Sequence, residues 1–412
     1  MKRPPTIGPT AIAIAVGPIV GGLFTTYLSW RYVFAGEVLV VIAILALAGR
    51  MEDGPKQSGV RLDLVGTALS ALGLGMIVFG ILRSGTWGFV KPKPGAPEWL
   101  GLSPVIWLIL GGACVIWLFL AWENRVIARG GEPLIDLKSI RNPVLRGGLT
   151  AFFFQYFVQG GMFFAVPLFL SVALGLSAIE TGVRLLPLSL TLIIAAAGIP
   201  RFFPQASPRR VARIGFGALF VGLTVFVGAL DAGAGAEIVT GPMLIAGVGV
   251  GCLASQLGSI TVSSVSDEHS DEVGGLQNTI TNLGISVGTA LTGAIVMAAL
   301  TTSFLADVQQ NPAVPESVKT QATTELSGGA PFVSDAELEA GLKKANVPPE
   351  ATSAIIDANE KARLDGLRTA MAVLALMSIV GLLFSGWIPA EQPGSQAAAS
   401  PRGDPVAGAA PA

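Results

Sequence analysis

The sequence predicts an all-α integral membrane protein, a helical bundle with about ten transmembrane helices. Of its 412 residues, 51% are hydrophobic and only 13% are charged, and the mean hydropathy is +0.66. A soluble domain carries about 25% charged residues, and a membrane-spanning helix needs about 20 mainly apolar ones. Ten runs meet that requirement: about 8–27, 33–49, 64–82, 105–122, 147–173, 180–199, 212–231, 239–262, 274–301 and 367–388.

The first apolar run follows a basic start and could be a signal peptide. However, a Gly17-Pro18 pair lies in its middle and no small-residue cleavage pattern follows it. The sequence therefore favours a spanning helix, bent where Pro18 removes one backbone hydrogen bond. Gly17, Gly21 and Gly22 would leave a bare surface beside the bend, which suits an interface that opens and closes.

Glycines in the later helices recur at helical spacing. Such spacing puts them on one helix face, where a neighbouring backbone can approach closely. The positions are Gly66, Gly73 and Gly80, seven apart, and the pairs Gly17/Gly21, Gly247/Gly251 and Gly284/Gly288, four apart.

The basic residues predict the orientation of the chain. With the N-terminus inside, the short outside loops hold only Arg31, Arg83, Lys91 and Lys93, and the inside segments hold many more. Cytoplasmic loops carry the excess of Lys and Arg. We therefore expect both termini in the cytoplasm of a multi-pass protein of the plasma or inner membrane.

The polar segment 302–364 is then the one sizeable outside loop. Ser334-Asp-Ala-Glu337 has the form of a capping box that opens a short helix. Pro348-Pro349-Glu350 predicts a second helix that runs toward the last span. We interpret 302–364 as a solvated cap; the alternative is a docking or gating element. Residues 389–412, rich in Ala, Pro, Gly and Ser, are typical of a disordered tail.

Composition also excludes several function classes. The formal net charge is −1, so bulk charge indicates no nucleic-acid partner. Cys114 and Cys252 are isolated and form neither a disulfide framework nor a metal site. His269 is the only histidine, so no histidine metal cluster or Ser-His-Asp triad can be assembled from the membrane segments. We expect no cofactor, no metal and no enzyme.

Several stretches resemble one family when taken in order. Gly17-Pro18-Ile19-Val20-Gly21-Gly22 resembles the antiporter motif in the fifth helix of major facilitator superfamily exporters. "SWRYVF" (29–34) resembles the loop that follows it in the fourteen-helix drug–proton antiporters of the EmrB/QacA type. "EPLIDLKSIRNPVLRGGL" (132–149), "PLFLSVALGLSAIETGVRLLPL" (167–188) and "GGLQNTITNLGISVGTAL" (274–291) resemble later segments of that family.

The resemblance implies that the ten runs match the family's helices five to fourteen, without its first four. Residues 1–50 would hold two helices of the N-terminal half, and 51–124 an extra pair. Residues 125–388 would form the six-helix C-terminal half, with 302–364 as its outside loop. The family's motif loop between helices two and three, and its early proton-linked acid, would be absent from this chain.

This sequence departs from the family at three places. Ala13 stands where the family usually has another glycine before Gly17, and Glu37 where it commonly has asparagine. The loop "RFFPQASPRRVAR" (201–213) keeps the basic charge of the family's turn without its usual Gly-and-Asp signature.

Glu37 and Arg184 are the candidates for proton transfer and gating. An acid inside an apolar helix is costly and is by default a functional hypothesis. Arg184 sits at a comparable depth in the run 180–199 and could hold Glu37 ionised. Both interpretations, proton carrier and structural pair, stay open.

Five amides are candidates for a substrate cavity: Gln155, Gln159, Gln256, Asn278 and Asn282. Gln155 and Gln159 are one turn apart, as are Asn278 and Asn282. Interhelical hydrogen bonding is the ordinary use of such amides, and we favour it for each.

The resemblance implies a proton-coupled transporter that exports drugs or other amphipathic small molecules by alternating access between two helical halves. Its partners would be the lipid bilayer, such a substrate, and protons. The alternative is a truncated, non-transporting remnant whose six-helix half binds a partner. A membrane-embedded enzyme ranks third.

Overall fold

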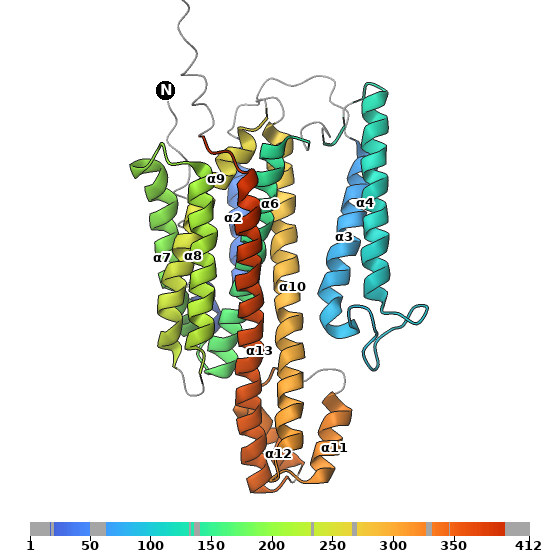
Figure 1. The fold of residues 1–412 in the computed structure, drawn as a ribbon, viewed down its shortest axis with the longest axis vertical. Coiled ribbons are helices and arrows are strands. Elements are labelled where there is room, and N and C mark those ends of the chain that lie inside the picture. Colours follow the sequence, from blue (N-terminus) through green and yellow to red (C-terminus); the bar gives the residue numbers. More distant parts are fainter. Residues whose placement is uncertain are drawn as a thin grey trace, which may run out of the picture.

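The computed structural model describes residues 17, 20–49, 63–131, 133–135, 141–231, 235–265, 270–326, 332–345 and 347–391. Nine helices in these ranges are long and apolar enough to cross a membrane, which confirms the predicted fold class (Figure 1). The tenth predicted span is described only at Gly17 and at residues 20–27, which are helical. Pro18, His269 and most of the predicted tail lie outside the described residues.

Six helices form the main bundle. They are α6 (Pro143–Leu168, continued by η1, Phe169–Ala173), α7 (Ala178–Phe202), α8 (Pro208–Ala229), α9 (Thr240–Val262, preceded by η2, Ala236–Val239), α10 (Ser270–Gln310) and α13 (Pro349–Phe384, followed by η5, Ser385–Trp387). The first residue of α6, α8 and α13 is proline. The first N–H groups of a helix have no partner within the helix, so the N–H that proline lacks costs no intrahelical hydrogen bond. Large apolar side chains such as Phe169, Phe216 and Phe226 fill one continuous core between these helices.

The predicted glycine faces form close backbone contacts in this bundle. A Cβ atom on Gly251 would lie 2.6 Å from the carbonyl oxygen of Leu192, and one on Gly284 would lie 2.8 Å from that of Phe153. Gly247 and Gly288 meet the backbones of α7 and α6 in the same way. The small-residue spacing therefore identified where α9 packs on α7 and α10 on α6.

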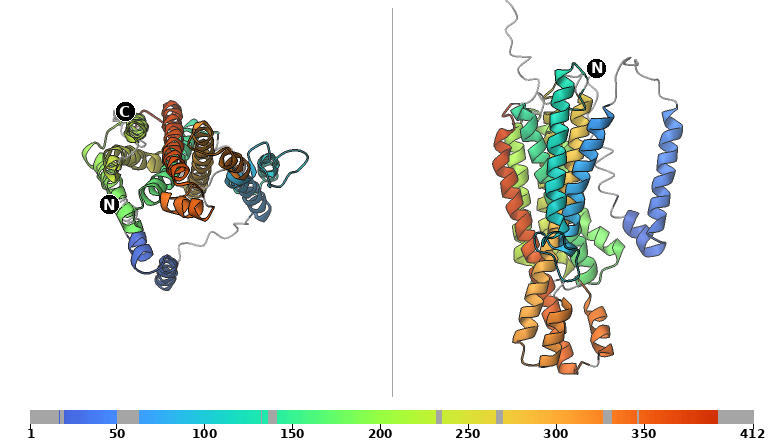
Figure 2. Two further views of the ribbon diagram at one scale, coloured as in Figure 1. Left: turned by 90° about the horizontal axis from the view of Figure 1, so that it is seen from below. Right: turned by 90° about the vertical axis from the view of Figure 1, so that its right-hand side faces the viewer.

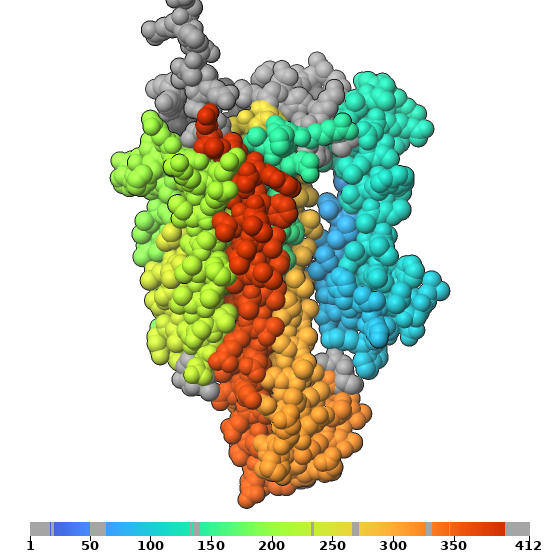
Figure 3. All heavy atoms as spheres, viewed as in Figure 1, coloured from blue at the N-terminus to red at the C-terminus, as the bar shows by residue number. Residues whose placement is uncertain are grey.

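A separate hairpin flanks the bundle. It consists of α3 (Leu64–Trp87) and α4 (Pro104–Ala128), and it lies beside α10 (Figures 1 and 3). Gly66, Gly73 and Gly80 are the buried glycines along α3; they lie on one face, as their spacing predicts, and that face packs on α4. The other faces of the hairpin are apolar and mostly exposed, as expected for helices surrounded by lipid.

Helix α2 (Arg31–Ala48) stands outside the bundle (Figure 2). None of its residues is buried, although its mean hydropathy is 2.1. Residues 20–27 precede it and reach the beginning of α7. Since α2 is apolar on all sides, lipid or other helices must cover it.

Helices α10 and α13 continue past the membrane into a cap. With 41 residues, α10 is about 60 Å long, whereas the hydrocarbon core is about 30 Å thick. The cap adds α11 (Glu316–Glu325) and α12 (Asp335–Lys344), which surround an apolar core of its own. The predicted capping box at Ser334 and Glu337 is present, and α13 begins at the predicted Pro349.

Candidate functional site

Residues 20–27 meet the bundle at the first turn of α7. A Cβ atom on Gly22 would lie 2.7 Å from the carbonyl oxygen of Ala178 and 2.8 Å from the Cα atom of Ile179. The backbone N–H of Ile179 donates a hydrogen bond to Thr26 Oγ1 at 3.2 Å. Two segments more than 150 residues apart in the sequence are thus in backbone contact, and the contact requires glycine at position 22.

The other residues of the predicted motif differ from Gly22. A Cβ atom added to Gly17 or to Gly21 would have no heavy atom within 4 Å, so the bare surface of these two glycines faces no described neighbour. Pro18 lies outside the described residues. Of the three motif glycines, Gly22 is therefore the one at which the structure shows a close approach.

The first turn of α7 is a rigid surface for this contact. The Ser177 hydroxyl accepts the backbone N–H of Glu180, and the Glu180 carboxylate accepts the backbone N–H of Ser177 at 2.8 Å. This capping box satisfies free N–H groups at the helix start. Sequence reasoning did not identify the box, although Ser177 and Glu180 have its spacing.

Glu37 and Arg184 are placed on different helices. Glu37 is exposed on α2, and Arg184 is half-buried on α7, between one and two turns beyond Ile179. Among the described ion pairs none joins these two side chains. Arg184 therefore lies near the Gly22 contact along α7, while Glu37 lies on the helix that follows residues 20–27.

The amides of α6 are buried in the bundle. Gln155 is 1% exposed, and the amide oxygens of Gln155 and Gln159 are buried without a hydrogen-bond donor among the described residues. A buried polar atom left without a partner costs about 1–3 kcal/mol. Gln155 and Gln159 are one turn apart, so their two amide oxygens lie on one face of α6.

The remaining candidate amides make local contacts. Gln256 is 3% exposed and donates to Ser255 Oγ at 3.3 Å. Asn282 donates to the backbone oxygen of Asn278 at 2.9 Å, on an exposed face of α10. Each of these two contacts lies within a single helix, α9 or α10.

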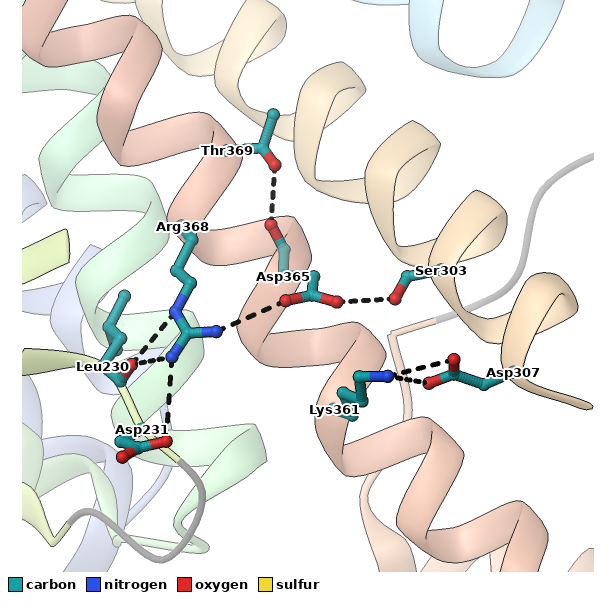
Figure 4. Close-up of polar contacts among 8 residues, drawn as sticks. All are labelled: Leu230, Asp231, Ser303, Asp307, Lys361, Asp365, Arg368 and Thr369. Atoms are coloured by element: carbon teal, nitrogen blue, oxygen red, sulfur yellow. Dashed lines mark hydrogen bonds and ion pairs between the residues drawn. The ribbon is translucent and has the colours of Figure 1, made fainter. Parts of the chain in front are cut away.

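A polar layer joins the bundle to the cap (Figure 4). Arg368 on α13 donates through Nε to the backbone oxygen of Leu230, just after α8, at 3.0 Å. Asp365 accepts from Arg368 at 3.5 Å and from Ser303 Oγ of α10 at 2.7 Å. The Arg368 cation lies at the C-terminal end of α8, where a positive charge is favourable. Through Arg368 and Asp365 this layer links α8, α10 and α13 at one level.

Comparison with known proteins identifies the family. Residues 8–289 match the Major Facilitator Superfamily. The chain belongs to the major facilitator superfamily.

Its relatives in the superfamily carry names from antibiotic export. The "Probable actinorhodin transporter" of Streptomyces coelicolor is 27% identical over 82% of this chain and 56% of its own length. The "Tetracenomycin C resistance and export protein" of Streptomyces glaucescens is 29% identical over 70% of this chain and 51% of its own length. The "Puromycin resistance protein pur8" of Streptomyces alboniger is 28% identical over 73% of this chain and 57% of its own length.

This major facilitator chain spans about half the length of the curated relatives it matches. Among solved structures, a bacterial homolog of the human lysosomal transporter Spinster, inward-facing and unoccupied, is 16% identical. The match covers 78% of this chain and 68% of the Spinster homolog, with a TM-score of 0.43.

Two polar groups of this superfamily member were not identified from the sequence. Gln277 of α10 donates to the backbone oxygen of Gly258 in α9 at 3.4 Å and also contacts Thr261. Arg368 follows the segment 302–364, which the sequence predicts to be a long outside loop, and the charges of such a loop carry no weight in predicting orientation. Both side chains act between helices, and no local sequence pattern marks such partners.

Proposed function

We propose that the chain forms part of a proton-coupled exporter of amphipathic small molecules, of the fourteen-helix drug–proton antiporter type. The observation that carries the proposal is the membership of the superfamily together with relatives named for antibiotic export and resistance. The contact between Gly22 and α7 supports it, because a side-chain-free contact between distant segments can open and close without repacking side chains. The two buried acceptors on α6 supply a place for polar groups of a substrate.

The proposed parts follow the helices. Residues 1–50 belong to the N-terminal half, 51–124 to an additional helix pair, and 125–388 to a six-helix C-terminal half. The cap, 302–364, lies outside the cell. Both termini lie in the cytoplasm, and the bundle crosses the plasma or inner membrane.

Accumulation of a fluorescent amphipathic cation tests the function. Cells that lack their own drug exporters and express this chain should accumulate less dye than cells with an empty vector. A protonophore should abolish the difference, because coupling to protons supplies the driving force. Equal accumulation in both cell lines would contradict export by this chain.

Thiol labelling tests the sidedness. Cys114 and Cys252, both unpaired, are first replaced with serine. Ser353 in the cap and Gln205 in the α7–α8 turn are then changed singly to cysteine; Ser353 and Gln205 are exposed. We expect a membrane-impermeant maleimide to label Ser353→Cys on intact cells, and Gln205→Cys only after permeabilisation. The reverse pattern would invert the topology.

Glu37→Gln tests the proposed proton carrier. A neutral glutamine keeps the shape of the side chain but cannot release a proton, so drug-induced proton release in proteoliposomes should be lost while drug binding persists. If Glu37 instead serves as a structural partner of Arg184, Glu37→Gln should lower thermal stability. The double change with Arg184→Gln should then recover much of that loss. Unchanged proton release would remove Glu37 from the mechanism.

A further inference from the structure

Two carboxyl groups meet at one end of the α3–α4 hairpin. Glu123 lies near the end of α4 and is 0% exposed, and Asp63 precedes the first turn of α3. A Cβ atom on Gly66 would touch both Asp63 Oδ2 and Glu123 Oε1, so the two oxygens border the same methyl-sized space. The two carboxyl groups are close enough to repel each other when both are ionised, and to form a hydrogen bond when one of them holds a proton.

The donors around the pair are divided unequally. Asp63 accepts the backbone N–H of Gly66 at 2.9 Å and the indole N–H of Trp122 at 2.8 Å. Glu123 Oε2 accepts the backbone N–H of Leu134 at 2.8 Å. Glu123 Oε1 is buried and has no donor among the described residues.

No counter-charge offsets these two acids among the described residues. None of the ion pairs found in that part of the chain includes Asp63 or Glu123. Asp63 is the one charged side chain of the described part that acts electrostatically on Glu123. The segment 133–135, which contacts Glu123, has no ionisable side chain, and the next charged residue on α4 is the exposed Arg125. Glu272, in the first turn of α10, does not act on Glu123.

Ionising both carboxyl groups at neutral pH is unfavourable here, because their mutual repulsion adds to the cost of burying Glu123. Asp63 has two donors and the positive end of α3, which favours a negative charge. Glu123 has the unmatched oxygen. A proton on Oε1 turns that oxygen into a donor and satisfies it against Asp63 Oδ2.

We propose that Asp63 and Glu123 form a proton-binding pair in which Glu123 Oε1 carries the proton and donates it in a hydrogen bond to Asp63. The proposed hydrogen bond joins the start of α3 to the end of α4, and Glu123 also binds residues 133–135, which lead toward α6. Loss of the proton at high pH leaves two facing negative charges and loosens this junction. The pair is separate from Glu37 and from the export site, and it does not depend on the proposed function.

Infrared difference spectroscopy of the purified chain, titrated from neutral to alkaline pH, tests the pair. Wild type should show the carbonyl band of a protonated carboxylic acid that disappears on titration, and Glu123→Gln should lack it. Asp63→Asn should lack this band too. The introduced amide removes the negative charge beside Glu123 and donates a hydrogen bond to Glu123 Oε1, so Glu123 can be ionised at neutral pH. Asparagine also keeps the cap of α3. Glu98→Gln, at an exposed loop position, is the control and should keep the band.

Thermal unfolding provides a second readout. The folded chain holds a proton that the unfolded chain releases at neutral pH, so the Tm of wild type should fall as pH rises. Glu123→Gln retains a donor toward Asp63, so it should fold as wild type does at neutral pH and lose less Tm at alkaline pH. Absence of a Glu123-dependent band would overturn the proposal. So would a band that persists in Asp63→Asn, because burial alone would then hold the proton.

Discussion

Replacing Gly22 with alanine is expected to abolish the proposed export and to separate residues 20–27 from α7. The added methyl group would lie 2.7 Å from the carbonyl oxygen of Ala178 and 2.8 Å from the Cα atom of Ile179. Both are backbone atoms in the capped first turn of α7, so they cannot turn aside as a flexible side chain would. The measurements are dye efflux and the yield of a disulfide between Thr26→Cys and Ile179→Cys, which should both fall.

Gly21→Ala is the matched control for this prediction. No heavy atom lies within 4 Å of a Cβ at position 21, and alanine favours a helix over glycine by about 1 kcal/mol. Efflux and cross-linking should therefore stay at the level of the unmodified chain or rise. Equal losses in both variants would mean that flexibility of the helix, and not its contact with α7, matters.

Replacing Gly288 with alanine is expected to destabilise the six-helix bundle. Its Cβ would overlap with the carbonyl oxygen of Phe157 and lie 2.8 Å from the carbonyl carbon, where α10 packs on α6. Overpacking of a filled core costs about 1–3 kcal/mol, and here the obstacle is backbone. The Tm in detergent should fall clearly below that of the unmodified chain.

Gly217→Ala on α8 is the control for this second prediction. Nothing lies within 4 Å of its Cβ position, so helix propensity should leave the Tm unchanged or raise it. If Gly288→Ala unfolds at the same temperature as Gly217→Ala, α10 does not pack on the backbone of α6 as closely as the structure shows.

Much of the membrane architecture could be predicted because it depends on local composition. Each predicted span from 33–49 onward overlaps an observed helix, and the largest differences are the extensions of α10 and α13 into the cap. The run 105–122 became α4, which continues to Ala128. The prediction from hydropathy ended that helix at its first charged residue and so missed Glu123, which is buried by its partners and not by lipid.

The cap shows a second limit. The run 274–301 extends to Gln310 because Leu300, Phe304 and Val308 continue an apolar stripe on α10. That stripe packs on Ile355 and Ala362 of α13, which lie more than 45 residues further along the chain. Hydropathy marks where lipid is needed, but it does not show which polar segments fold around a core of their own.

The candidate site was predictable in kind and not in detail. Spacing marked Gly17, Gly21 and Gly22 equally, whereas only the arrangement of α7 shows that Gly22 is the point of close approach. The same holds for the amides: the amide oxygens of Gln155 and Gln159 are buried without a donor among the described residues, whereas Asn282 donates to Asn278. These differences arise from neighbours distant in sequence.

A reversible cross-link tests most directly whether export requires residues 20–27 to move against α7. The chain carrying Thr26→Cys and Ile179→Cys, without its native cysteines, is assayed for dye efflux before oxidation, after oxidation and after reduction, beside Thr26→Cys alone. We predict that oxidation stops efflux in the double variant only and that reduction restores it. Efflux that continues with the disulfide formed, or no efflux before oxidation, would contradict export through this interface.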